Sequence, residues 1–395
     1  MTSLIADAMG RIGIGIAAAL LLSQAARPAA ATEFHVATTG DDHAPGSAAS
    51  PFLTIRRGLD AAQAGDTIYL HAGVYAEGVS TEDGPIRGGT SWADALTIAA
   101  WPGDTVVLRP RKGTPRVITL ARPEASFIVF RGLVLDARRV RFDGVKITWS
   151  TFDPSNGSHH IRIENSEVMN ARRQGLLVGG HHNEFLRLRV HDNGRSDFDH
   201  GLYITGADNL VDGCEVYRNA GWGVHVYDGD SSDADRNTVR NSRIYANARI
   251  GRRGAGVILS SGEDNIALNN VIFGNRVGVQ VGPNTARARI YNNTVFAQTD
   301  IGIGVDEGAA DSEVRNNLVF ANPSAIRDAG ARTLISSNLV NVDPGVIDAA
   351  TFDARITESS LAIDAGEPLE AVPFDHDGNP RPQGAGYDVG AFERR

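Results

Sequence analysis

Short apolar segments recur along the chain, and within each of them apolar and polar residues alternate. This period of two predicts β-strands, and no helical period separates the segments. One kind of segment has a central aliphatic residue that returns every 22 to 28 residues, at Val168, Val190, Val216, Ile244, Ile272, Val295 and Val319. Repeats of this length predict a β-solenoid, in which each coil stacks on the previous one.

Two further columns keep the same register. A side-chain amide falls three residues after the central aliphatic, at Asn193, Asn219, Asn247, Asn275, Gln298 and Asn322. A mostly aromatic set falls one residue after it, at Met169, His191, Tyr217, Tyr245, Phe273, Phe296 and Phe320. Stacked amides can hydrogen-bond from coil to coil. We therefore predict two structural ladders and interpret His191 as a member of the second.

The other kind of segment begins with a glycine, at Gly144, Gly175, Gly201, Gly223, Gly256, Gly278 and Gly302. The next residue is always apolar, and strand alternation points it inward. The residue after that points outward, which gives the column Lys146, Leu177, Tyr203, His225, Ile258, Gln280 and Gly304. Tyr203 and His225 should therefore be neighbours on adjacent strands.

Ionisable and aromatic residues gather on this outward face between about residues 146 and 260. The candidate catalytic residues are His225, Tyr203, His200, Lys146 and Asp199. The candidate substrate-binding residues are Arg173, Tyr227, Arg252, Arg253 and Trp222, and the candidate calcium ligands are Asp228 and Asp230. A solvated turn is the competing interpretation of the aspartate-rich loop, because it lacks the spacing of a defined calcium loop.

Composition narrows the choice of partner. The formal net charge is −9 and only two lysines are present, Lys112 and Lys146, which argues against nucleic-acid binding. An anionic polysaccharide would need a local arginine cluster or a bound cation. The single cysteine, Cys214, excludes an intramolecular disulfide.

The chain begins with a segment typical of a signal peptide. Arg11 precedes the apolar run "IGIGIAAALLL", and small residues follow at Ala29 and Ala31. We expect residues 1–31 to be removed and the protein to be secreted or periplasmic. A membrane anchor is the competing interpretation of this run, and no later stretch is typical of a membrane helix.

Three stretches carry a family resemblance. The coils, with "FIVFRGLVLDA" as an early turn, resemble the right-handed parallel β-helix of the pectate-lyase-like superfamily. Residues 37–79 are similar to the N-terminal segment of secreted members, and the resemblance implies a capping helix at about Ile55 to Ala64. Residues 361–393 are similar to the choice-of-anchor Q region. The expected fold is an all-β parallel β-helix over 32–345 and a tail over 346–395 that packs on it.

The resemblance covers lyases, hydrolases, epimerases and non-catalytic adhesins, so it leaves the chemistry open. We expect a polysaccharide lyase that acts on a uronate polymer by β-elimination. His225 is then the candidate base and Tyr203 the candidate acid, and family members that use lysine or arginine as base give Lys146 a competing claim. Arginines or calcium would neutralise the substrate carboxylate.

Three alternatives stay open. Paired carboxylates such as Asp199 and Asp228 could hydrolyse a glycosidic bond. "SDFDHG" partly resembles the motif of alginate epimerases, which keeps a uronate C5-epimerase in view. A carbohydrate-binding surface protein without catalysis is the third. In each case the expected partner is an anionic polysaccharide, the expected state is a monomer, and calcium is the one cofactor considered.

Overall fold

The computed structural model describes residues 31–148, 157–229, 233–251 and 253–394. Thr32–Arg395 form one compact unit, and the predicted signal peptide lies outside the described residues except for Ala31. Within the described ranges, no helix has the length and apolar character that crossing a membrane would require.

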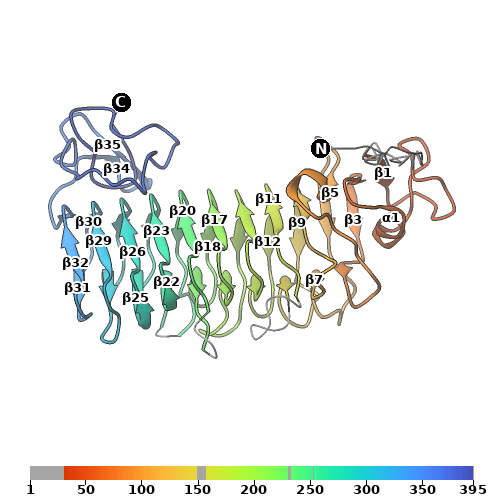
Figure 1. Cartoon of the computed structure of the whole chain (residues 1–395), viewed down its shortest axis with the longest axis horizontal. Coiled ribbons are helices and arrows are strands. Elements are labelled where there is room, and N and C mark those ends of the chain that lie inside the picture. Colours follow the sequence, from red (N-terminus) through yellow and green to blue (C-terminus); the bar gives the residue numbers. More distant parts are fainter. Residues whose placement is uncertain (1–30, 149–156, 230–232, 252, 395) are drawn as a thin grey trace, which may run out of the picture. The chain divides into compact units, whose positions relative to one another are not determined.

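Three long parallel sheets run along the unit (Figure 1). Sheet 1 contains β1 (Glu33–Val36), β2 (Thr67–Leu70), β5 (Leu96–Ala100), β8 (Ile128–Arg131), β11 (Ile161–Glu164), β14 (Glu184–Leu186), β17 (Leu210–Asp212), β20 (Thr238–Arg240), β23 (Ile266–Leu268), β26 (Arg289–Tyr291), β29 (Glu313–Arg315) and β32 (Leu334–Ser336). Sheet 2 contains β4 (Val79–Ser80), β7 (Ile118–Leu120), β10 (Val145–Ile147), β13 (Leu176–Val178), β16 (Leu202–Ile204), β19 (Val224–Val226), β22 (Ala255–Glu263), β25 (Val277–Ala286), β28 (Ile301–Val305) and β31 (Ser324–Asp328). Sheet 3 contains β3 (Gly73–Tyr75), β6 (Val106–Leu108), β9 (Leu133–Asp136), β12 (Glu167–Met169), β15 (Arg189–His191), β18 (Glu215–Tyr217), β21 (Arg243–Tyr245), β24 (Val271–Phe273), β27 (Thr294–Phe296), β30 (Leu318–Phe320) and β33 (Leu339–Val340).

The core lies inside the coils, between the three sheets. Most strands have three residues, and their first and last side chains in sheet 2 point inward, as Leu202 and Ile204 do, both with no exposed surface. The inward residues after the repeated glycines are also fully buried. Each such apolar side chain contributes about 1.5–3 kcal/mol on burial. The predicted inward and outward columns are thus confirmed, and with them the parallel β-helix.

Both predicted ladders are confirmed. Asn219 donates its side-chain amide to the Asn247 side-chain oxygen at 2.9 Å, and Asn247 donates to that of Asn275 at 3.2 Å. In the second ladder the Tyr217 and Tyr245 rings stack with their centroids 5.0 Å apart. His191 stacks on Tyr217 at 4.6 Å and hydrogen-bonds Glu167, which fits the ladder interpretation.

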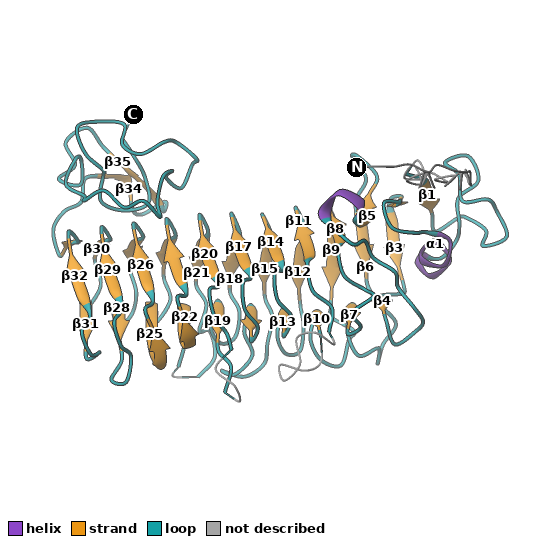
Figure 2. Ribbon diagram, in the orientation of Figure 1, coloured by secondary structure: helices purple, strands orange, loops and turns teal. Residues whose placement is uncertain are grey.

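A short helix covers the N-terminal end of the coils, as predicted (Figure 2). Helix α1 (Ile55–Ala61) is capped by the Thr54 hydroxyl, which accepts the Arg57 N–H, and it buries Ile55 and Leu59. The predicted end at Ala64 is wrong by three residues. Ala62 is already extended, and a turn that needs the positive φ of Gly65 follows. A short 3-10 turn, η1 (Trp92–Asp94), lies further along.

The C-terminal segment packs on the outside of the coils near the aromatic ladder. It contains the antiparallel pair β34 (Val346–Asp348) and β35 (Asp353–Ile356), and its Phe352 stacks on Phe273 with centroids 4.3 Å apart. Phe392 and Ile356 join the same buried cluster as Phe296 and Phe320. Arg381 and Glu393 form an ion pair whose two side chains have no exposed surface.

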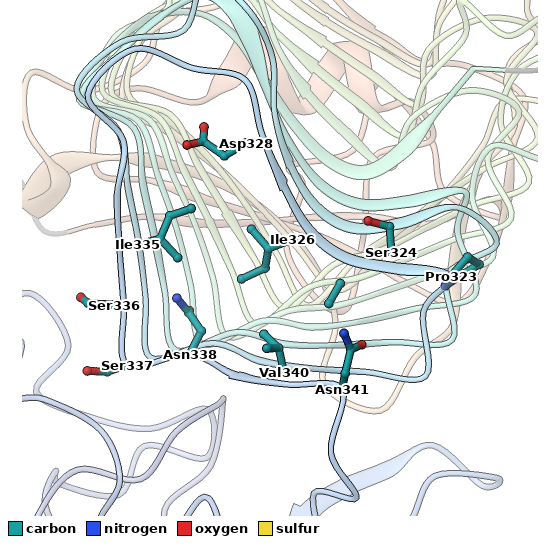
Figure 3. Close-up of a pocket in the computed structure, with 11 residues that line it drawn as sticks. Pro323, Ser324, Ile326, Asp328, Ile335, Ser336, Ser337, Asn338, Val340 and Asn341 are labelled. Atoms are coloured by element: carbon teal, nitrogen blue, oxygen red, sulfur yellow. The ribbon is translucent and has the colours of Figure 1, made fainter.

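The last coil ends in an open cavity (Figure 3). Ile326, Ile335 and Val340 line it, and its volume is about 590 Å³. It arises because β31, β32 and β33 are the terminal strands of their sheets, so the interior of the last coil is uncovered by the described residues. We attribute this cavity to the end of the coil stack and do not treat it as the candidate site. The candidate site is identified below from the side chains that gather on the outer face of sheet 2.

In six successive coils, the turn before the sheet 1 strand carries a charged residue with positive φ, and the sign of its charge alternates. The residues are Asp208, Arg236, Asp264, Arg287, Asp311 and Arg332. Arg236 contacts Asp208 at 2.8 Å, and Arg332 contacts Asp311 at 2.6 Å. Exposed pairs of this kind contribute about 0–1 kcal/mol each, so their effect on stability is small.

Candidate active site

The outward column of sheet 2 is present as predicted. Lys146 of β10 is paired with Leu177 of β13, Leu177 with Tyr203 of β16, and Tyr203 with His225 of β19. Inward neighbours on both sides of each residue are buried, so these side chains are held on the outer face by strand alternation. Ile258 of β22 continues the column.

His225 lies at the centre of an aromatic cluster. The Tyr203 ring stacks on it with centroids 5.0 Å apart and planes inclined by 14°, and the Tyr227 ring stacks at 5.5 Å and 13°. The centroid of the Trp222 ring lies 5.0 Å from that of the same imidazole. The predicted adjacency of Tyr203 and His225 is therefore confirmed, and Tyr227 and Trp222 join them.

His200 is buried beneath this cluster. Its Nε2 lies 3.1 Å from Nδ1 of His225, and its Nδ1 accepts the backbone N–H of Trp222 at 3.3 Å. Burial lowers the pKa of His200 to about 3. Burial first and then the neighbouring His200 hold the pKa of His225 well below its usual 6.5. Both imidazoles are therefore neutral at pH 7.

The indole N–H of Trp222 is a buried polar group in this cluster. The residue is 9% exposed, and its indole N–H is buried without a hydrogen-bond partner in the described part of the chain. An unpaired buried donor costs about 1–3 kcal/mol. A ligand oxygen that accepted this hydrogen bond would recover that cost, which supports the predicted substrate-binding role of Trp222.

A second, basic cluster surrounds Phe142, just before β10. The guanidinium groups of Arg116, Arg141 and Arg173 lie 5.2 to 5.3 Å from the centre of its ring. Arg116 pairs with Asp143 at 2.9 Å. Arg141 and Arg173 are exposed, and neither makes an ion pair with any described residue. Sequence reasoning found Arg173 but missed Arg116, Arg141 and Phe142.

Lys146 adjoins this basic cluster. Burial lowers the pKa of Lys146 to about 8, with a further lowering by Arg116 that Asp143 opposes. About a tenth of an amine with this pKa is neutral at pH 7. A fraction of Lys146 is therefore neutral at pH 7 and could accept a proton on the outer face of sheet 2.

Asp199 has a local role that the sequence did not predict. Its Oδ2 accepts the backbone N–H groups of Arg195 and Ser196 at 2.9 and 2.8 Å, and also the Ser196 hydroxyl at 2.9 Å. The carboxylate, 8% exposed, thus closes its own turn. This engagement argues against the catalytic role considered for Asp199.

The remaining candidates divide into described and undescribed residues. Arg253 is exposed, and Asp228 is 4% exposed with its backbone N–H donated to the Ser261 hydroxyl at 2.7 Å. Arg252 and Asp230 lie outside the described residues. Within the described ranges, no group of three or more His, Cys, Asp or Glu side chains is arranged to hold a metal ion. Because Asp230 is outside the described residues, the calcium role of Asp228 and Asp230 stays a prediction, and we derive no step through calcium.

The comparisons with known proteins agree with this fold. The family described as right handed beta helix region matches residues 154–340. The chain folds as a right-handed parallel β-helix, a fold that it shares with a pectate lyase of known structure. No curated protein sequence matches it.

Solved structures with the same fold include several carbohydrate-related proteins. Pectate lyase Pel9A is 18% identical with a TM-score of 0.71, and the match covers 92% of this chain and 96% of that one. XylC in complex with xylose is 12% identical with a TM-score of 0.60, covering 92% and 99%. A glycoside hydrolase is 11% identical with a TM-score of 0.54, covering 83% and 99%. At these identities the likeness shows the fold alone, because one fold hosts several chemistries.

Proposed function

We propose that the protein is a secreted carbohydrate-active enzyme that cleaves a uronate-containing polysaccharide by β-elimination on the outer face of sheet 2. The observation that carries the proposal is the position of Lys146 in the outward column of sheet 2, near the arginine cluster on Phe142, and its pKa, lowered to about 8, fits the role of a base. β-Elimination needs a base and a group that neutralises the uronate carboxylate, and this face offers both. Pectate lyase Pel9A has the same fold, so this fold can support a lyase reaction.

The reaction follows from these positions. Arg141 and Arg173 pair with the substrate carboxylate, which acidifies the neighbouring C–H group. The neutral amine of Lys146 takes that proton, the electron pair forms the carbon–carbon double bond, and the glycosidic C–O bond breaks. The departing oxygen takes a proton from the Lys146 ammonium, which restores the neutral amine. The sequence analysis predicted His225 as the base and Tyr203 as the acid. In this scheme both residues instead contact a neighbouring sugar.

Two other reactions remain candidates with less support. Hydrolysis needs two free carboxylates, and that of Asp199 already accepts three hydrogen bonds within its turn. A C5-epimerase would use the same proton removal but return the proton to the opposite face of the sugar. A binding protein without catalysis would use the aromatic cluster alone.

The remaining expectations extend this proposal. The apolar N-terminal run supports export, hence action on extracellular polysaccharide. The substrate is anionic although the net charge of the chain is −9, because the basic cluster supplies a local positive field. The proposed enzyme acts as a monomer.

One assay separates the candidates. The protein is incubated with pectate, alginate and other uronate polymers, with and without a chelator, and the ultraviolet absorbance of unsaturated sugar ends is followed. A lyase produces that absorbance. New reducing ends without it would identify a hydrolase, and deuterium uptake from heavy water without chain shortening would identify an epimerase. Retention on the polymers with no chemical change would leave only binding and overturn the proposal.

A further inference from the structure

Three hydrogen bonds form a continuous line through the aromatic cluster. The backbone N–H of Trp222 lies 3.3 Å from Nδ1 of His200, and Nε2 of His200 lies 3.1 Å from Nδ1 of His225. Nε2 of His225 then lies 3.2 Å from the Ser260 hydroxyl oxygen. Every ring nitrogen of both histidines is therefore engaged.

The direction of donation along these hydrogen bonds is fixed by the backbone N–H of Trp222 at the buried end. A backbone N–H can only donate, so Nδ1 of His200 must carry no proton. A neutral imidazole holds one proton, which places it on Nε2 of His200 and makes that nitrogen the donor to His225. Nδ1 of His225 must then accept, and the His225 proton lies on Nε2, directed at Ser260.

We propose that His200 is a positioning residue that fixes His225 in the Nε2–H tautomer, so that His225 presents a hydrogen-bond donor, not a base, to the outer face of sheet 2. In the structure the His225 N–H is donated to the Ser260 hydroxyl, so the donor that remains for a ligand is the Ser260 O–H, and an oxygen of a sugar hydroxyl or carboxylate fits it. Ser260, which accepts from His225, turns its own hydroxyl proton toward the same ligand.

The surroundings keep the pair neutral. The groups that face His225 are the rings of Tyr203, Trp222 and Tyr227, the Ser260 hydroxyl, and His200. No carboxylate hydrogen-bonds either imidazole within the described residues. Nothing nearby therefore stabilises an imidazolium, and protonation of His200 at Nδ1 would also oppose the Trp222 N–H.

The decisive measurement is the tautomer itself. Long-range ¹H–¹⁵N correlation spectra of the intact protein between pH 5.5 and 8 identify which ring nitrogen carries the proton, and the spectrum of His225→Gln assigns the His225 signals. We expect both His200 and His225 as neutral Nε2–H forms with no titration in this range. A His225 with its proton on Nδ1, or one that titrates near its ordinary pKa of about 6.5, would overturn the proposal.

The variant His200→Ala tests the cause. It removes the donor to Nδ1, so His225 should become a mixture of tautomers and begin to titrate near neutral pH. His191→Ala, which alters a histidine of the outer aromatic ladder, should leave the His225 signals unchanged. Should His200→Ala fail to fold, the wild-type tautomers still decide the question.

A second readout rests on the proposed function. A glutamine side chain can present an N–H near the position of Nε2 but cannot act as a base. If His225 is a donor, His225→Gln should retain at least tenfold more activity than His225→Ala, and equal loss in both would contradict the donor role. The tautomer spectra need no substrate, so failure of the lyase proposal and failure of this one are distinguishable.

Discussion

Lys146 and His225 lie in the same outward column, with Leu177 and Tyr203 on the two coils between them. Three coil steps correspond to about 14 Å at the backbone. The proton next to a uronate carboxylate and the oxygen that leaves are only a few bonds apart. In the proposed reaction, Lys146 and His225 are therefore too far apart to act on the same glycosidic bond, and only one of them can be the base.

Replacing Lys146 tests whether Lys146 or His225 is the base of the proposed reaction. Lys146→Met keeps the length of the side chain but removes the amine, and we expect turnover to fall about 10²- to 10⁴-fold, the usual contribution of a general base. Gln280→Ala is the matched control, because it lies in the same column three coils beyond Tyr203 and outside both clusters. Turnover close to wild type in Lys146→Met, on a polymer that the parent cleaves, would return the base role to His225.

The distance also predicts how two substitutions combine. Residues more than about 7–10 Å apart usually give additive free-energy effects. The losses of kcat/KM in Lys146→Met and His225→Ala should therefore multiply in the double variant. A double variant no worse than Lys146→Met alone would mean that the two side chains act in one step, against the separation described above.

The pH dependence separates the two candidate bases without mutation. Lys146 must be neutral to accept a proton, and its pKa is about 8. The value of kcat/KM should therefore rise with pH, about tenfold per unit, and level off near pH 8. With His225 as base, whose pKa is well below 6.5, the profile would already be flat above pH 7. The measurement is a series of initial rates between pH 6 and 9.5.

Asn247 tests the amide ladder. It is 4% exposed, accepts from Asn219, and donates to the Val216 carbonyl at 2.9 Å. Asn247→Ala leaves these groups unpaired, and we expect the free energy of unfolding to fall by about 1–3 kcal/mol. Arg249→Ala, an exposed neighbour, should change it by less than about 0.5 kcal/mol. Equal midpoints in urea for Asn247→Ala and wild type would mean that the ladder contributes nothing to stability.

The buried ion pair of the C-terminal segment gives a further test. Arg381→Leu would leave the Glu393 carboxylate buried without its partner, at a cost of about 3–5 kcal/mol. The segment should then detach from the aromatic ladder, which hydrogen exchange of residues 360–394 would detect. The exposed pair Arg355–Asp353 is the control, and its loss should have little effect. Unchanged protection in Arg381→Leu would show that apolar contacts alone hold the segment.

The fold could be predicted from sequence because each column repeats one physical requirement many times. Asn219 and Asn247 share a position since the buried amide must find a partner on the next coil, and that regularity is visible without coordinates. The adjacency of Tyr203 and His225 followed in the same way.

The site was harder to predict because its contacts do not repeat. Arg116, Arg141 and Arg173 come from different turns and meet only at Phe142. Asp199 has a fitting residue type, but its partners are local backbone groups that no pattern reveals. The pKa of Lys146 is lowered by burial of the side chain, and the amino-acid composition does not predict that burial.

The row of alternating charges from Asp208 to Arg332 restricts how the β-helix can lengthen during evolution. Asp264 and Arg287 are successive members of that row. Duplication of a single coil would repeat one sign and set like charges about 4.8 Å apart at the backbone. Duplication of two adjacent coils would preserve the alternation. Lengthening of the β-helix is therefore favoured in pairs of coils, and an inherited insertion in this region should carry an even number of them.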